Sequence, residues 1–153
     1  MVEGLIGTAR RLATSGGTGK PRQSDLRRAI STAYYALYHA LAKDGADLFV
    51  GVAASRPDAA WAQAYRALEH GFAKNACSQV RGLGFAPPLI ACAETFVRLQ
   101  QDRHSADYDP VARFTRTEAM VAVDEAERAI RDLRSAGRAD RRALAVQIRM
   151  KTR

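Results

Sequence analysis

The chain has 153 residues, 47% hydrophobic and 26% charged, which excludes a disordered polar chain and predicts one domain with a single core. No apolar run approaches the roughly 18 residues of a membrane span, and no apolar leader with a small-residue cleavage site opens the chain, so we expect a cytoplasmic protein without a membrane partner. The net charge of +8 resembles that of nucleic-acid-binding proteins, but residues 134–153 alone hold seven basic residues against one acid.

The first 23 residues predict a short helix and a flexible linker. Residues 1–15 carry apolar side chains at helical spacing, namely Leu5, Ile6, Ala9 and Leu12. The glycine-rich residues 15–21 then break the pattern. Their Gly-Lys pair invites comparison with a phosphate-binding loop, but Pro21 occupies the Ser or Thr position and no strand precedes it, so we exclude that motif.

The central element is a predicted helix from about Ser24, as its N-cap, to Lys43. Residues 29–42 contain no charged side chain, and one face is formed by Leu26, Ile30, Ala33, Leu37 and Leu41. The opposite stripe holds Arg28, Thr32, Tyr35 and His39 instead of the Lys and Glu of a surface helix. We therefore expect this helix to be the most buried element, packed between the helices that carry Trp61 and Leu89.

Further helices are predicted downstream, and no alternating strand pattern is present. Residues 47–50 are too short to assign; a helix then runs from Asp58 to about Cys77, and residues 81–88 form a loop. The next helix runs from about Leu89 to Asp107. A capping box of Thr115 and Glu118 opens another, which ends at Gly137. The fold class is therefore all-α, an up-and-down bundle of four to five helices over residues 24–136, followed by a basic tail or short helix over 137–153.

Cysteines and histidines do not predict a metal site or a cofactor. Cys77 and Cys92 stand alone on separate predicted helices, and we interpret them as small buried hydrophobic residues. The three histidines lie on three different helices, without the near spacing of a zinc protease motif. His39 is either a hydrogen-bonded core histidine or a catalytic one, and for His70 a packing or helix-end role is favoured.

Candidate site residues lie at the end of the Leu89 helix. Its apolar face continues through Gln100, Arg103 and Asp107, so an inward face becomes polar within two turns. One explanation is a plain i,i+4 ion pair between Arg103 and Asp107. The other is a polar pocket in which Arg103, His104, Asp107 and Tyr108 meet groups of the central helix.

Two stretches carry a resemblance to a known family. Residues 27–39 are Arg-Arg-Ala-Ile-Ser-Thr-Ala-Tyr-Tyr-Ala-Leu-Tyr-His, and residues 103–110 are Arg-His-Ser-Ala-Asp-Tyr-Asp-Pro. Together they resemble the HEPN superfamily, above all uncharacterised bacterial members with a Tyr-Tyr-Ala-x-x-His helix and an Arg-x-x-Ala-Asp-Tyr helix end. The resemblance implies a helical bundle that commonly dimerises, in a group that contains metal-independent ribonucleases of toxin-antitoxin and phage-defence systems.

The nuclease members pair an Arg with a His four to six residues later, and this chain departs from that pattern. Tyr108 stands five residues after Arg103, and a tyrosine is a weak general base at neutral pH. Arg98 precedes His104 by six residues, but on a straight helix the two point about 120° apart, so we take Arg103 as the motif arginine.

Two classes of function follow. In an RNA-acting protein, Arg103 would neutralise the scissile phosphate while His104 or His39 transfers protons during attack by the 2′-hydroxyl. In a non-catalytic HEPN module, the pocket would serve dimerisation, nucleotide binding or a partner such as a nucleotidyltransferase-type antitoxin. We expect a homodimer, pocket support from Arg28, Tyr35 and Gln100, and possible nucleic-acid contacts at Arg138, Arg141, Arg142 and Arg149.

Overall fold

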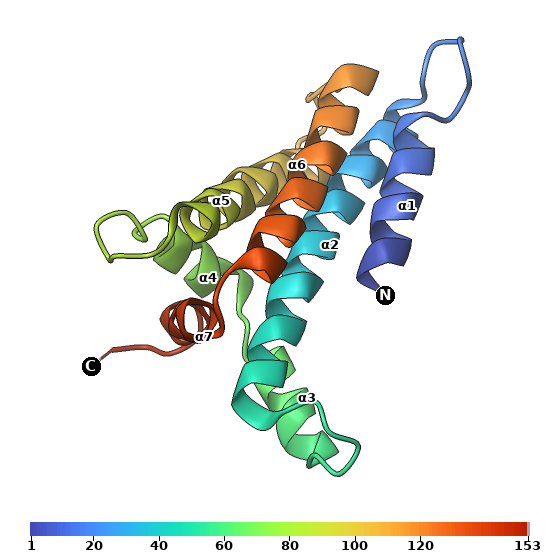
Figure 1. The fold of residues 1–153 in the computed structure, drawn as a ribbon. Coiled ribbons are helices and arrows are strands. Elements are labelled where there is room, and N and C mark those ends of the chain that lie inside the picture. The colour runs from blue at the N-terminus through green and yellow to red at the C-terminus, as the bar shows by residue number, and fades with distance from the viewer. Residues whose placement is uncertain (153) are drawn as a thin grey trace.

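The computed structural model describes residues 1–152, and these fold into seven α-helices without a strand (Figure 1). The helices are α1 (Val2–Ala13), α2 (Gln23–Val50), α3 (Asp58–Arg66), α4 (His70–Cys77), α5 (Pro87–Tyr108), α6 (Arg116–Ser135) and α7 (Arg138–Gln147). The predicted all-α class is confirmed. Within residues 1–152, no helix combines the length and the apolarity that crossing a bilayer requires.

Helix α2 is the axis of the molecule. It runs the length of the fold in Figure 1, and α1, α3, α5, α6 and α7 all pack against it. On its predicted core face, Leu26 and Leu37 are fully buried and Ile30 is 2% exposed. Ala36 and Ala42, which lie about 100° and 140° to either side of Leu37 around the helix, are also fully buried. The helix is therefore enclosed on more than one face, as the absence of charge between residues 29 and 42 predicts.

The ends of α2 differ from the sequence-based boundaries. The helix starts at Gln23 after an extended Arg22, so Ser24 lies in the first turn and its predicted role as N-cap is wrong. The side-chain amide of Gln23 donates to the Phe114 carbonyl and accepts from the Phe114 amide, which fixes this end. At the other end the helix continues through Gly45 and stops only at Gly51, whose φ of 106° favours glycine.

The predicted helix from Asp58 to Cys77 is two helices, because the chain breaks between α3 and α4. Leu68 lies in this break with 2% exposure, and its carbonyl accepts a hydrogen bond from the Tyr38 hydroxyl at 2.8 Å. A continuous helix would place that carbonyl in its own ladder, so tertiary contacts override the apolar periodicity. The break makes His70 the first residue of α4.

The predicted capping box of Thr115 and Glu118 is confirmed at the start of α6.

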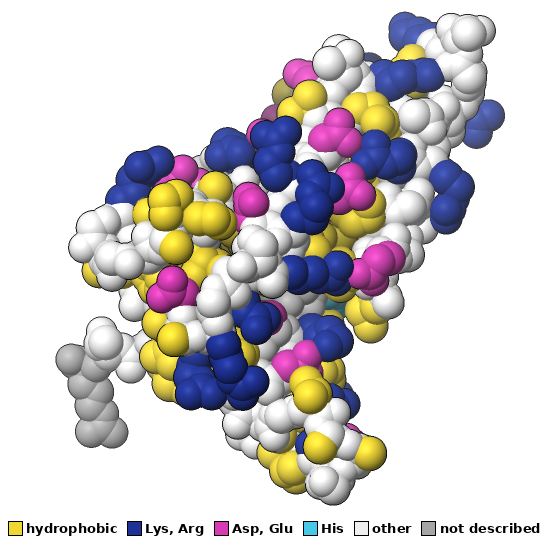
Figure 2. All heavy atoms as spheres, in the orientation of Figure 1, with side chains coloured by type: hydrophobic (Ala, Val, Ile, Leu, Met, Phe, Trp, Pro, Cys, Tyr) yellow, Lys and Arg dark blue, Asp and Glu magenta, His cyan; other side chains and the backbone are white. Residues whose placement is uncertain are grey.

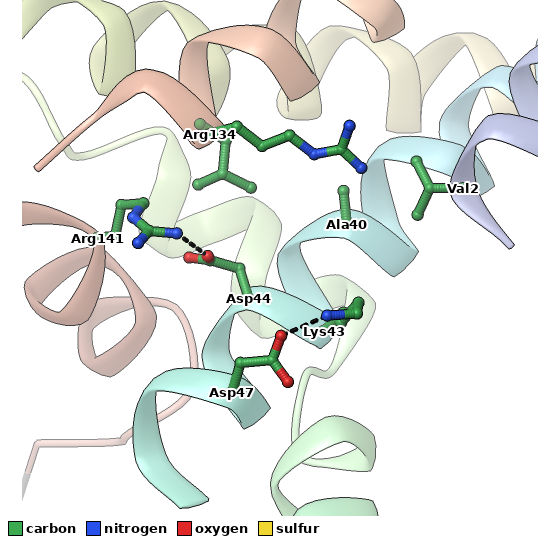
Figure 3. Close-up of a pocket in the computed structure, with 8 residues that line it drawn as sticks. Val2, Ala40, Lys43, Asp44, Asp47, Arg134 and Arg141 are labelled. Carbon is green, nitrogen blue, oxygen red and sulfur yellow. Dashed lines mark hydrogen bonds and ion pairs between the residues drawn. The ribbon is translucent and has the colours of Figure 1, made fainter. Parts of the chain in front are cut away.

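The C-terminal segment is a docked helix. Gly137 separates α6 from α7, and a hollow of about 210 Å³ lies between α2, α6 and α7 (Figure 3). In the hollow, Arg141 pairs with Asp44, whose pKa burial raises although Arg141 opposes the rise. The Arg149 guanidinium donates to the carbonyls of Leu41 at 2.7 Å and Ala42 at 3.2 Å. Charged side chains therefore hold α7 against α2.

Gly45 gives a test of this docking. A Cβ at Gly45 would clash with the Arg149 guanidinium, so Gly45→Ala must displace it from the two carbonyls. Hydrogen bonds to a charged group are worth about 1.5 to 3 kcal/mol, more than the roughly 1 kcal/mol that alanine adds to a helix. We expect Gly45→Ala to lower the free energy of unfolding by about 1 to 2 kcal/mol in urea titrations.

The sign should reverse when Arg149 is absent. In an Arg149→Ala background, Gly45→Ala should stabilise the protein by about 0.5 to 1 kcal/mol, because only helix propensity remains. The matched control is Gly4→Ala in α1, where a Cβ meets nothing within 4 Å; it should be stabilising in both backgrounds. The same destabilisation by Gly45→Ala in both backgrounds would contradict this account of the Arg149 contact.

Candidate functional site

The end of α5 faces the tyrosines of α2, and Arg103 lies between them. The guanidinium carbon of Arg103 is 5.2 Å from the ring centre of Tyr34, 5.9 Å from that of Tyr35 and 5.8 Å from that of Tyr108. Its side chain is only 12% exposed. The structure thus brings Arg103, Tyr35 and Tyr108 together, and the rings surround the cation with the negative faces that attract it.

Arg103 is poorly satisfied for a guanidinium that is so buried. Its ion-pair partner is Asp107, whose Oδ2 lies 3.7 Å from Nη1, beyond hydrogen-bonding distance, and also accepts from the Ser31 hydroxyl at 3.2 Å. The Nε of Arg103 is fully buried without a hydrogen-bond partner among residues 1–152, and the guanidinium lies close enough to the Tyr34 hydroxyl to oppose the rise in its pKa. Buried donors are nearly always paired, because an unmade bond costs about 1 to 3 kcal/mol. The guanidinium therefore has donors available for another group.

His70, for which the sequence favours a packing or helix-end role, is the first residue of α4 and packs in this cluster. It shares a hydrogen bond through Nδ1 with the Tyr34 hydroxyl, and its ring stacks on Tyr38 with 4.2 Å between ring centres. The amide of Gln100 donates to the His70 carbonyl at 3.1 Å, while the Gln100 Oε1 is buried without a partner. Gln100 thus lies in the cluster as predicted, and it supports α4 directly.

His39 belongs to a neighbouring part of the same network. Its Nδ1 lies 2.5 Å from the Tyr65 hydroxyl of α3, and its ring centre is 6.2 Å from that of Tyr35. Tyr35 therefore stands between His39 and Arg103. The position of His39 fits a hydrogen-bonded histidine of the interior, and its contact with the Arg103 cluster is indirect.

Burial and charge keep these groups neutral. Burial lowers the pKa of His70, the positive charge of Arg103 lowers it further, and so does His39 when its ring is protonated. Burial also lowers the pKa of His39. The pKa of Tyr34 is raised, because burial outweighs the opposing effect of Arg103. At neutral pH, Arg103 is thus a cation among neutral rings, an environment that favours an anionic ligand.

The rim of the site is open to solvent. Tyr108, the last residue of α5, is 65% exposed, and its ring centre is 5.0 Å from that of the exposed His104. Arg27 fixes the chain beyond it by donating to the carbonyls of Ala106, Asp109 and Ala112. The sequence predicts that Arg28 supports the pocket, but Arg28 is exposed. The adjacent Arg27 makes the contact with the end of α5 instead.

Basic residues proposed for nucleic-acid contact divide into two pairs. Arg138 and Arg142 are exposed on α7, whereas Arg141 and Arg149 turn inward to Asp44 and to the α2 carbonyls. Burial lowers the pKa of Arg149 to about 10. Figure 2 shows Lys and Arg side chains spread over the visible face with Asp and Glu among them. The inward pair therefore serves the fold, and any nucleic-acid contact on α7 is left to the outward pair.

Sequence reasoning did not name Tyr34, Tyr38, Tyr65 or Arg27 as site residues. The tyrosines carried a weak signal, since aromatic side chains at helical spacing usually indicate core. For His70 the sequence indicated packing at a helix end but not its contact with Tyr34, which depends on the break between α3 and α4.

Comparisons with known proteins add no relative: the chain matches no protein-family model, no curated protein and no solved structure. In the described residues, no group of three or more His, Cys, Asp and Glu side chains is arranged to hold a metal ion.

The lowered histidine pKa values predict a pH dependence of stability. A histidine whose folded pKa lies below its unfolded value of about 6.5 binds protons more readily when unfolded, so stability falls as pH drops below 6.5. We expect the free energy of unfolding to decrease between pH 7.5 and pH 5.5, and to decrease less in His70→Gln. His104→Gln is the control, because His104 is exposed. Equal slopes for His70→Gln and wild type in urea titrations would contradict the prediction.

Proposed function

We propose that this chain is an HEPN-like, metal-independent endoribonuclease whose Arg103 binds the scissile phosphate. The observation that carries the proposal is the Arg103 guanidinium, 12% exposed, surrounded by three tyrosines, 3.7 Å from its carboxylate partner and with its Nε unpartnered among residues 1–152. A phosphate offers the charge and the acceptor oxygens that these donors lack, and Arg binds it with a planar fork of N–H groups. The two HEPN-like stretches support the proposal, since both lie at this cluster.

In this proposal, each side chain has a defined task. Arg103 neutralises the phosphate and stabilises the charge that develops as the 2′-hydroxyl attacks. The exposed His104, beside Tyr108, transfers the protons, because it can reach a substrate at the rim, whereas His39 is bonded to Tyr65. Asp107 orients Arg103 from the adjacent turn. The HEPN-like up-and-down bundle, the cytoplasmic location and a toxin-like role in toxin-antitoxin or phage-defence systems belong to the same proposal.

A second candidate is a non-catalytic HEPN module that holds a nucleotide or a partner, such as a nucleotidyltransferase-type antitoxin. The observation that favours it is the depth of Arg103: little of the side chain reaches solvent, and Asp107 and the tyrosine rings already surround it. In such a module, Arg103 holds α5 to α2 and its charge is compensated within the protein.

RNA cleavage in EDTA separates the two candidates. We expect the purified protein to cleave single-stranded RNA with no divalent ion, and Arg103→Ala to lower kcat/KM by at least about 100-fold, the scale of losing a group that stabilises transition-state charge. The matched control is Arg98→Ala on the same helix, which removes a surface pair with Glu125 and a hydrogen bond to the Thr95 hydroxyl, both away from the Arg103 cluster. Wild-type protein without activity, or equal activity in Arg103→Ala of unchanged thermal stability, would favour the non-catalytic module.

We also propose a symmetric homodimer. Val111 and Val121 are large hydrophobic residues left exposed after the end of α5 and on α6, a surface that a second copy of the chain would cover. Sedimentation velocity at micromolar concentration should show a species of twice the chain mass of 16.7 kDa. A single monomeric species at that concentration would contradict the dimer.

A further inference from the structure

On the basis of the proposed function, we infer that Tyr108 is a stacking platform for a nucleobase of single-stranded RNA whose adjoining phosphate is bound by Arg103. The substrate is then recognised by an unstacked base and a backbone phosphate together.

Tyr108 combines exposure with a fixed position. Among residues 1–152, it is the single aromatic residue among the exposed large hydrophobic side chains, at 65% exposure. The backbone around it is held, since the Asp109 amide donates to the Ser105 carbonyl and Arg27 donates to the carbonyl of Asp109 at 2.8 Å. A ring that is exposed but anchored loses little conformational entropy when a flat ligand covers it.

The neighbours of Tyr108 define the chemistry of the ligand. The Arg103 guanidinium carbon lies 5.8 Å from the Tyr108 ring centre, and the Nε of that guanidinium has no partner among residues 1–152, so an aromatic surface and an incompletely bonded cation lie side by side. A nucleotide presents a flat base and a phosphate in the same way. The exposed Arg28 and Arg113 belong to the segments that Arg27 and Gln23 tie together, and they add positive charge at this end of the molecule.

The stacking role of Tyr108 predicts that single-stranded RNA, and not duplex RNA, is bound. In a duplex each base is already stacked between its neighbours, so Tyr108 can be covered only by a base of a single strand, a loop or an end. Stacking uses the face that all bases share, so the platform accepts different bases. We therefore expect a preference for single strands with little sequence selectivity.

The test uses the full chain in EDTA and a short, labelled, single-stranded 2′-fluoro oligoribonucleotide of mixed sequence, which lacks the attacking hydroxyl. By fluorescence anisotropy, Tyr108→Ala should bind roughly 5- to 150-fold more weakly than wild type, the range for one stacked base. Tyr108→Phe keeps the ring and should bind as wild type does. A series of the same probe, with one abasic residue moved along it, should contain a position that weakens wild-type binding and leaves Tyr108→Ala unchanged.

The experiment distinguishes failure of the stacking role of Tyr108 from failure of the proposed function. If Arg103→Ala loses binding while Tyr108→Ala binds as wild type does, the stacking role is wrong and the proposed function stands. If Tyr108→Ala dissociates the oligomer in sedimentation and leaves the affinity per protomer unchanged, Tyr108 is a protein contact and the inference is overturned. If wild type binds no probe, both the inference and the proposed function are wrong. Coupling between the abasic position and Tyr108 supports the inference, because loss of folding alone does not produce it.

Discussion

Helix α2 is covered on almost every side, and this enclosure constrains the rest of the molecule. Five helices pack on it, so a polar group that it carries must find its partner inside the protein. Tyr34, Tyr38 and His39 find theirs in His70, the Leu68 carbonyl and Tyr65. These partners belong to the start of α4, the break before it and the end of α3, respectively. The break between α3 and α4 and the orientation of α4 thus follow from the hydrogen-bonding needs of α2. The histidine and tyrosine rings are fixed before any ligand is present.

Arg103 differs from the other inward arginines in the partners of its terminal nitrogens. Arg27 and Arg149 donate from their terminal nitrogens to backbone carbonyls, at a helix end for Arg27 and over Gly45 for Arg149, although the Nε of Arg149 is buried without a partner like that of Arg103. Arg103 meets aromatic faces and one carboxylate at 3.7 Å. Cation–π contact stabilises a charge but leaves its N–H donors unbonded. Of these three partly buried arginines, Arg27 and Arg149 therefore serve the fold through backbone carbonyls, whereas Arg103 meets no carbonyl of residues 1–152 and is the one that we propose binds an anion.

The basic residues of the chain also divide into those that hold the fold together and those that face solvent. A count of Lys and Arg suggested a nucleic-acid tail, but part of that charge is internal: Arg141 and Arg149 hold α7 in place through Asp44 and the carbonyls of α2. Net charge therefore overstates what the surface offers to a phosphate backbone. The proposed RNA site depends instead on a few positions near the end of α5, where the incompletely bonded guanidinium of Arg103 lies beside the exposed ring of Tyr108.

The sequence alone determined the helical class, the dominance of α2 and the face of α5 that turns polar, because these depend on periodicity within one helix. It also determined that Gln100 and Arg103 face inward, since they continue the apolar face of α5. Tyr35 is predicted to face a partner because it lies on a stripe of α2 that lacks the Lys and Glu of a surface helix. Only the tertiary structure decided where 58–77 breaks, that Gly45 lies inside a helix beneath Arg149, and that His70 joins the tyrosines. These depend on contacts between residues far apart in the chain, and periodicity carries no information on which helix meets which. The same reason separates Arg27 from Arg28: neighbours in sequence, they point about 100° apart, and the position of α5 decides which one is used.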